Sequence, residues 1–193
     1  MNGPVPLTSA QRLRGRLTLI GLFVLFFGTA LVAGILRFVG WQPEGLRNHG
    51  ELLQPPADLR GITPRLADGG EYPWHGPEGK RWRIALAPPA DCAQPCVDLL
   101  ADLDKVWRLF GHDADEVHVL WIGAAPPATA PHPASLHVLQ ADAALLAALP
   151  QRQDPAGVPV YVIDPNGFVI LRYPPGFDPV GLRSDVAKLL KLL

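Results

Sequence analysis

The sequence predicts an α/β fold, a mixed β-sheet with flanking helices, preceded by one transmembrane helix. Three observations predict it. Residues 17–36 carry no charge and are almost entirely apolar. Strand-like and helix-like segments alternate after residue 79. The only two cysteines, Cys92 and Cys96, stand between the first of these strands and the first of these helices. With 193 residues, the chain is long enough for one soluble domain that needs no disulfide to support its core, plus an attached segment.

The overall charge argues against nucleic acid as a partner. The 17 basic and 18 acidic residues leave a net charge of −1, and no basic stripe follows the N-terminal region. Two cysteines at short spacing are too few for the disulfide framework of a small secreted protein. They indicate a redox pair or a metal-binding pair.

The apolar segment predicts a membrane anchor with a defined direction. At ~1.5 Å per residue, residues 17–36 span a hydrocarbon core of ~30 Å. Arg12, Arg14 and Arg16 precede the segment, and no acidic residue appears before Glu44, so the positive-inside rule places the N-terminus in the cytoplasm. A cleaved signal peptide is the alternative, although its apolar region is usually shorter, ~7–15 residues. We therefore predict a cytoplasmic N-terminus (1–16) and an anchor (17–39) that contacts the membrane.

Residues 40–78 contain many turn-forming residues and no sustained hydrophobic period. We predict an extended tether that ends in a short hairpin around Asp68–Gly70. His49 and His75 fall in this region and are interpreted as solvated loop residues. The folded domain is predicted to comprise residues 79–193.

The cysteines have a sequence context suited to chemistry. Residues 82–87 form an apolar strand-like segment, and the segment after the cysteines places apolar residues on one helix face, namely Leu99, Leu103, Val106 and Phe110. Both sulfurs therefore lie near a helix N-terminus, where free N–H groups and the macrodipole favour a thiolate. Because residues four apart share a helix face, the sulfurs can bond to each other or bind one soft metal ion. Disulfide exchange, copper(I) binding and a structural disulfide all stay open at this point.

The remaining elements complete a recognisable order. We predict strands at 116–122, 136–139, 158–163 and 168–173, a short helix at 141–149, and a C-terminal helix that begins at Asp178 and Pro179. The order strand, cysteine helix, strand, helix, hairpin, helix is the thioredoxin arrangement, a mixed sheet with helices on both faces. His118 and His137 fall within predicted strands and are interpreted as buried histidines bonded to backbone groups.

Two stretches resemble the Sco/SenC family. They are the strand at 79–87 followed by Cys92-x-x-x-Cys96, and Tyr161-Val-Ile-Asp-Pro-Asn-Gly167. The resemblance implies a membrane-tethered thioredoxin-fold protein that helps to build the copper site of cytochrome c oxidase, with an oxidase subunit as partner. It further implies that Cys92 and Cys96 are thiolate copper ligands or a redox pair. The third copper ligand of the family is a histidine shortly before the second stretch, and residues 154–159 contain no histidine.

Two hypotheses about function follow. In the first, the chain is a single-pass protein of a bacterial inner membrane whose exocytoplasmic domain assists copper-site assembly. It acts there through copper(I) handling or as a thiol–disulfide oxidoreductase, with Cys92 attacking and Cys96 resolving the mixed disulfide. In the second, the chain is a non-catalytic assembly or docking module in which Cys92 and Cys96 form a structural disulfide.

Overall fold

The computed structural model describes residues 9–38, 48–76 and 80–192. The chain divides into two compact units, Met1–Leu46 and Arg47–Leu193. Residues 1–8, 39–47, 77–79 and 193 lie outside the described part, and so do the predicted end of the anchor at residue 39 and the predicted boundary between tether and domain at 78–79.

The described part of the first unit is a single helix, α1 (Ser9–Phe38). Within it, Leu13–Leu36 is long and apolar enough to cross a membrane. Its apolar side chains are exposed, among them Leu25, Phe26 and Leu31. Exposure of so many apolar groups is unfavourable in water and favourable in lipid, as the predicted anchor requires.

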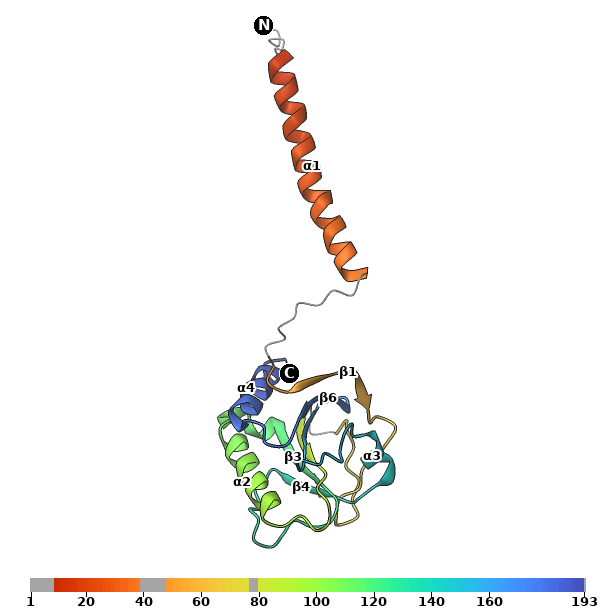
Figure 1. The fold of residues 1–193 in the computed structure, drawn as a ribbon, viewed down its shortest axis with the longest axis vertical. Helices are drawn as coiled ribbons and strands as arrows, with labels where there is room; N and C mark the ends of the chain where they lie inside the picture. The colour runs from red at the N-terminus through yellow and green to blue at the C-terminus, as the bar shows by residue number, and fades with distance from the viewer. Residues whose placement is uncertain (1–8, 39–47, 77–79, 193) are drawn as a thin grey trace. The chain divides into compact units, whose positions relative to one another are not determined.

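The second unit is a six-stranded mixed sheet with helices on both faces (Figure 1). The strand order is β1-β6-β5-β2-β3-β4, and β2 pairs in parallel with β3 and antiparallel with β5. The strands are β1 (Glu51–Asp58), β2 (Trp82–Leu86), β3 (Val117–Ile122), β4 (Leu136–Leu139), β5 (Val160–Ile163) and β6 (Phe168–Tyr173). The helices are α2 (Gln94–Arg108), α3 (Ala143–Ala148) and α4 (Pro179–Leu190), with a 3-10 turn η1 (Gly111–Glu116) before β3. The predicted thioredoxin-like class and every predicted strand and helix of this unit are confirmed.

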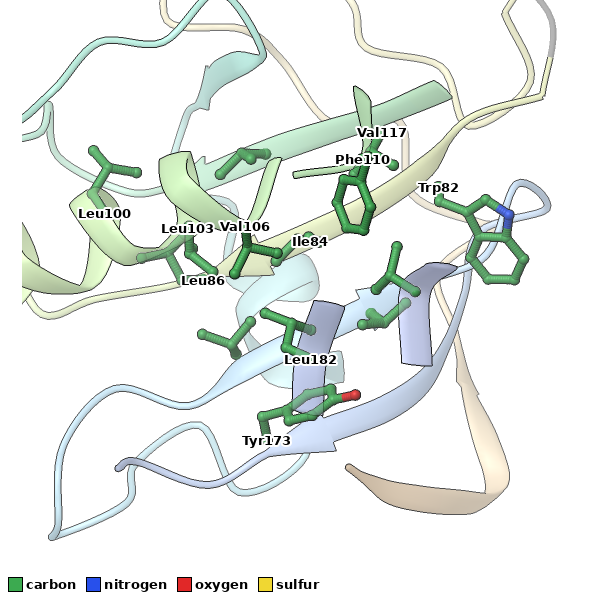
Figure 2. Packing of buried hydrophobic residues seen from close by; sticks show 14 of the residues in the cluster. Trp82, Ile84, Leu86, Leu100, Leu103, Val106, Phe110, Val117, Tyr173 and Leu182 are labelled. Atoms are coloured by element: carbon green, nitrogen blue, oxygen red, sulfur yellow. The ribbon is translucent and has the colours of Figure 1, made fainter. Parts of the chain in front are cut away.

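Alternation along the strands builds two separate cores. In β2, Ile84 and Leu86 face α2 and α4, whereas Ala85 faces the opposite side of the sheet. Figure 2 shows the first core, where the α2 side chains Leu100, Leu103 and Val106 pack toward β2 and Leu182 of α4 packs beside them. The cysteine helix is thus fixed to the sheet by its apolar face.

One region differs from the sequence prediction. Residues 51–58, predicted as part of a tether, form the edge strand β1, which pairs antiparallel with β6. The strand is hidden in the sequence because Pro55 and Pro56 interrupt it and because its burial pattern does not alternate. The predicted hairpin is present, with a bridge between Arg65 and Glu71 around Asp68–Gly70.

A buried carboxylate fastens the start of this unit to its last helix. Asp185 of α4 is 3% exposed, and it accepts hydrogen bonds from the backbone N–H groups of His49 and Gly50 and from the Tyr173 hydroxyl. Burial raises the pKa of Asp185, but the hydrogen bonds from Tyr173, Lys188 and His49 outweigh it and lower the pKa to about 2. His49 is an exposed loop residue, as predicted, and its backbone N–H and its ring Nδ1 also bond to Asp185. We call Asp185 with His49, Gly50 and Tyr173 the Asp185 cluster.

Candidate functional site

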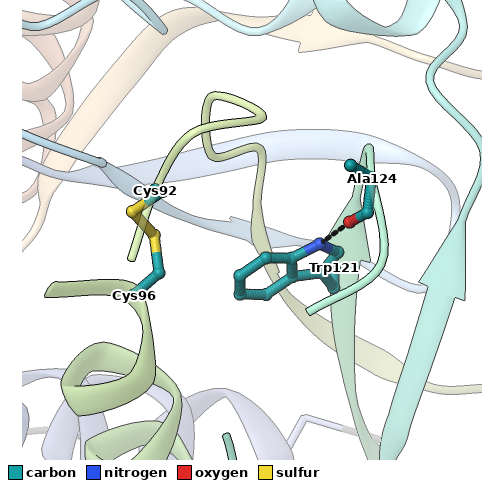
Figure 3. The surroundings of a disulfide bond; sticks show 4 residues. All are labelled: Cys92, Cys96, Trp121 and Ala124. Carbon is teal, nitrogen blue, oxygen red and sulfur yellow. Dashed lines mark hydrogen bonds between the residues drawn. A yellow bond between two sulfur atoms is a disulfide. The ribbon is translucent and has the colours of Figure 1, made fainter. Parts of the chain in front are cut away.

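The two cysteines form a disulfide at the junction of β2 and α2. The pair is joined, with Cα atoms 5.8 Å apart. Figure 3 shows Cys92 in the connecting loop and Cys96 at the start of the helix. The predicted ability of the two sulfurs to meet is confirmed.

Local backbone contacts hold each cysteine in place. The Cys92 N–H donates to the Pro89 carbonyl at 3.2 Å, which closes a turn after β2. The Cys96 N–H donates to the Ala93 carbonyl at 3.1 Å in the first turn of α2. Pro95 stands beside Cys96 near the helix start, where a proline costs no intrahelical hydrogen bond.

The two sulfurs differ in accessibility. Cys96 is 0% exposed and belongs to the core between α2 and the sheet, whereas Cys92 is half-buried and packs on its margin. Trp121 of β3 belongs to the same core and lies beside the pair in Figure 3. Only the Cys92 sulfur is placed to meet an incoming thiol or disulfide. The Cys96 sulfur lies in the first turn of α2, where the helix dipole stabilises a thiolate leaving group.

Cys92 borders a cavity of about 550 Å³. One wall is the start of α2, with Pro95, Asp98, Leu99 and Asp102. The facing wall is the loop of residues 152–158, and a third side is the turn around Phe177. A cavity of this size accommodates a short segment of another molecule beside the half-buried Cys92.

The loop at 152–158 is held firmly from behind. Asp154 accepts from the Ala156 N–H at 3.0 Å and pairs with Arg172 of β6 at 2.6 Å. Arg172 is 3% exposed and also pairs with Glu51 of β1 at 2.9 Å. Gly157 has φ 141°, and a Cβ there would lie 3.3 Å from a Pro175 carbon, so glycine suits this position. The loop is therefore a fixed wall of the cavity.

The histidines lie away from the cysteines. None of the residues described as lining the cavity is a histidine, and His132 is exposed elsewhere. The Nδ1 atom of His118 forms a hydrogen bond with the Tyr72 hydroxyl at 2.7 Å. The His118 ring also packs on the His137 ring, with ring centroids 4.2 Å apart. Its partner is thus a side chain, whereas a backbone partner was predicted. Burial lowers the pKa of His118 to about 4, with His137, Arg81 and Arg83 adding to the effect.

The residues present do not fit a three-ligand copper site. Among residues 9–38, 48–76 and 80–192, no three His, Cys, Asp or Glu side chains are grouped so that they could hold a metal ion. At the position where the Sco/SenC resemblance implies a histidine, Ala156, Gly157 and Val158 line the cavity. Within the described part of the chain, the two thiolates of the reduced pair are the only sulfur ligands.

Residues 82–193 match the family described as transmembrane-like, thioredoxin-like, C-terminal domain. The chain belongs to this family. The match begins at β2 and so includes both cysteines, the cavity loop and α4. No match was found among curated proteins.

Solved structures of Sco proteins share the fold. BsSco, described as a Sco family cytochrome c oxidase assembly protein with a disulfide switch, is 14% identical with a TM-score of 0.54, covering 75% of this chain and 98% of that one. Yeast Sco1 with copper bound is 16% identical with a TM-score of 0.53, covering 75% and 93%. A SCO1/SenC family lipoprotein of Bacillus anthracis is 16% identical with a TM-score of 0.50, covering 73% and 98%. The predicted Sco-like fold is confirmed.

The cavity and Arg152 were not found from the sequence. The cavity walls come from three segments far apart in the chain, and their meeting depends on the sheet order. Arg152 carries no motif, since it stands between two glutamines in a turn-rich stretch. The absence of a histidine from residues 154–159 was the one sequence feature that pointed to this loop.

Proposed function

We propose that this protein is a membrane-anchored thiol–disulfide oxidoreductase that acts through Cys92 and Cys96 outside the cytoplasm. The observation that carries the proposal is the difference between the two sulfurs, a half-buried Cys92 at the cavity and a fully buried Cys96 in the first turn of α2. A purely structural disulfide needs neither an accessible sulfur nor a cavity beside it.

The reaction begins with the reduced pair. The Cys92 thiolate attacks one sulfur of a partner's disulfide, and that bond breaks as the other partner sulfur leaves with the electron pair and takes a proton. Cys96 then loses its proton and attacks Cys92 in the mixed disulfide, which releases the partner's second sulfur as a thiolate that is then protonated. The partner gains two electrons and two protons, and this chain ends with the Cys92–Cys96 bond. A dithiol protein on the same side of the membrane restores the reduced pair by the reverse exchange.

The location follows from the anchor and its flanking charges. Leu13–Leu36 can span a membrane, and the arginines before it favour a cytoplasmic N-terminus. We propose the inner membrane of a bacterium, with the domain outside it and the boundaries predicted from the sequence at 1–16 and 17–39. Among its partners we propose the copper-site cysteines of a cytochrome c oxidase subunit, because the similar BsSco is described as an assembly protein of that oxidase.

Copper handling is the second candidate, favoured by the copper bound to the similar yeast Sco1. In this chain the two thiolates would have to hold copper(I) without a histidine from the cavity wall. We therefore expect weaker copper(I) binding than at a site of two cysteines and one histidine. Competition with a copper(I) chelator measures it, and tight binding of copper(II) by the reduced protein would contradict this expectation.

The direct test uses the full chain in detergent and three variants. A redox titration should show a reversible two-electron couple, and Cys96→Ser should trap a mixed disulfide with a disulfide substrate, whereas Cys92→Ser should trap none. In a strain that lacks the gene, the wild-type protein but not Cys92→Ser should restore oxidase activity. Thiols that stay reduced at every potential, or a mixed disulfide formed through Cys96, would overturn the exchange mechanism. A Ser135→Ala variant serves as the control, because Ser135 precedes β4 and does not line the cavity.

A further inference from the structure

The cavity beside Cys92 carries charges of both signs on opposite walls. Asp98 and Asp102 project from the α2 side, while Arg152 and Asp154 belong to the facing loop. The other lining residues are mainly apolar and include Leu99 of α2, Val158 of the loop and Phe177. A segment that occupies the cavity therefore meets an apolar floor and a charged group on either side.

Two of these four charges already have partners within the protein. Asp154 pairs with Arg172 at 2.6 Å, and Asp102 pairs with Lys105 at 3.0 Å. Asp98 accepts only from the neutral amide of Gln94, at 2.8 Å. Two charges thus stay without an oppositely charged partner among the described residues, Asp98 on one wall and Arg152 on the other.

Arg152 is the more unusual of the two. Its side chain is half-buried, and within the described part of the chain its guanidinium makes no hydrogen bond or ion pair. Guanidinium groups have five N–H donors, and none of the Arg152 nitrogens is among the buried side-chain atoms without a partner, so these donors are accessible to a ligand in the cavity. The group that fits best is a carboxylate, which accepts two parallel hydrogen bonds from arginine.

We propose that Arg152 binds a carboxylate of the cysteine-bearing partner segment and so selects partners with an acidic residue near the reactive cysteine. The segment lies in extended form across the apolar floor, with its acidic side chain toward the 152–158 loop. Because Asp98 lies on the other wall, a basic or neutral residue is favoured on the α2 side. This inference rests on the exchange function proposed above and adds the chemistry by which the partner is chosen.

The test compares short disulfide-bonded peptides that differ at one position. Each carries a glutamate, glutamine or lysine two residues from the cysteine, on its N-terminal or its C-terminal side. The full chain in detergent, in its reduced form, should react about 3- to 10-fold faster with the better of the two glutamate peptides than with its glutamine counterpart. The corresponding lysine peptide should react more slowly than the glutamine peptide.

Variants locate the preference. Arg152→Gln should remove the difference between glutamate and glutamine peptides, and Arg152→Lys should keep part of it. Arg183→Gln is the matched control, because it removes the same charge from an exposed arginine that contacts Leu109 at the far end of α2. It should retain the full preference. In Asp98→Asn, a peptide with a negative charge on the α2 side should be slowed less than it is in the wild-type protein.

Two outcomes would overturn the inference. One is equal reaction of the wild-type protein with all the peptides. The other is that Arg152→Gln slows the reaction with every peptide by the same factor and shifts the midpoint of the rate–pH profile, measured with the glutamine peptide between about pH 6 and pH 9. That result would mean that Arg152 stabilises the Cys92 thiolate and does not recognise the peptide. Failure to react with any peptide is a different result, because it would contradict the proposed exchange function and the recognition that depends on it.

Discussion

The Asp185 cluster and the cavity beside Cys92 use charged groups in opposite ways. In the Asp185 cluster, the buried carboxylate accepts from two backbone N–H groups and one hydroxyl, and Lys188 lies 3.1 Å from its other oxygen. At the cavity, Cys92 is accessible, and Arg152 and Asp98 lack oppositely charged partners among the described residues. A cluster whose bonds are all made within the fold stabilises it, whereas groups left without partners can act on another molecule.

A large effect on stability is expected at the Asp185 cluster. Asp185→Ala leaves the Tyr173 hydroxyl and two backbone N–H groups buried without an acceptor, which should cost about 3 kcal/mol. For a protein of this size the melting temperature falls by about 2–4 °C per kcal/mol. Asp185→Asn keeps one acceptor oxygen and should cost less. If Asp185→Ala lowered the free energy of unfolding no more than an aspartate-to-alanine substitution at the surface does, the cluster would not stabilise the fold.

Reduction of the disulfide should have a smaller effect. The bond closes a loop of only four positions, so in the chain-entropy account it contributes at most about 2 kcal/mol. We expect the reduced domain to stay folded, because α2 is held by its own apolar face against β2. Thermal melts of both forms check this. Unfolding on reduction would favour a structural disulfide and the non-catalytic docking module.

Acid should weaken the Asp185 cluster. The folded pKa of Asp185 lies at about 2, below its ordinary value near 4, so the charged form is favoured in the folded state. The contribution of the ionised Asp185 to the free energy of unfolding is complete above about pH 4 and is lost as the pH falls toward 2. Stability of wild type and Asp185→Asn should therefore converge in this range. If the free energies of unfolding of the two proteins differed by the same amount at every pH, the loss of stability in acid would not come from Asp185.

Local patterns predicted the cysteine end well. The apolar residues of 82–87 and the helical spacing of Leu99, Leu103 and Val106 are sufficient to place β2, the disulfide and α2 in sequence. These features depend on neighbours within a few turns of chain, where periodicity is informative.

Contacts between distant segments were beyond the sequence. The strand β1 is stabilised by pairing with β6 and by Asp185, which lies more than a hundred residues later. The partner of His118 is Tyr72, again a residue far away in the chain. The cavity wall at 152–158 depends on Arg172, which ties it to β1 and β6. No local period reports such pairings, so a tether and a backbone-bonded His118 were predicted in their place.

The smallest effect on stability is expected where the proposed recognition is strongest. Arg152→Gln and Asp98→Asn remove charges that have no oppositely charged partner among the described residues, so each should change the free energy of unfolding by less than about 0.5 kcal/mol. Arg172→Gln offers the contrast, because Arg172 is buried and pairs with Glu51 and Asp154, and its loss should cost about 2–4 kcal/mol. Denaturant unfolding of the three variants measures the difference. If Arg152→Gln were as destabilising as Arg172→Gln, Arg152 would be part of the scaffold, and a change in its peptide preference would no longer report on recognition.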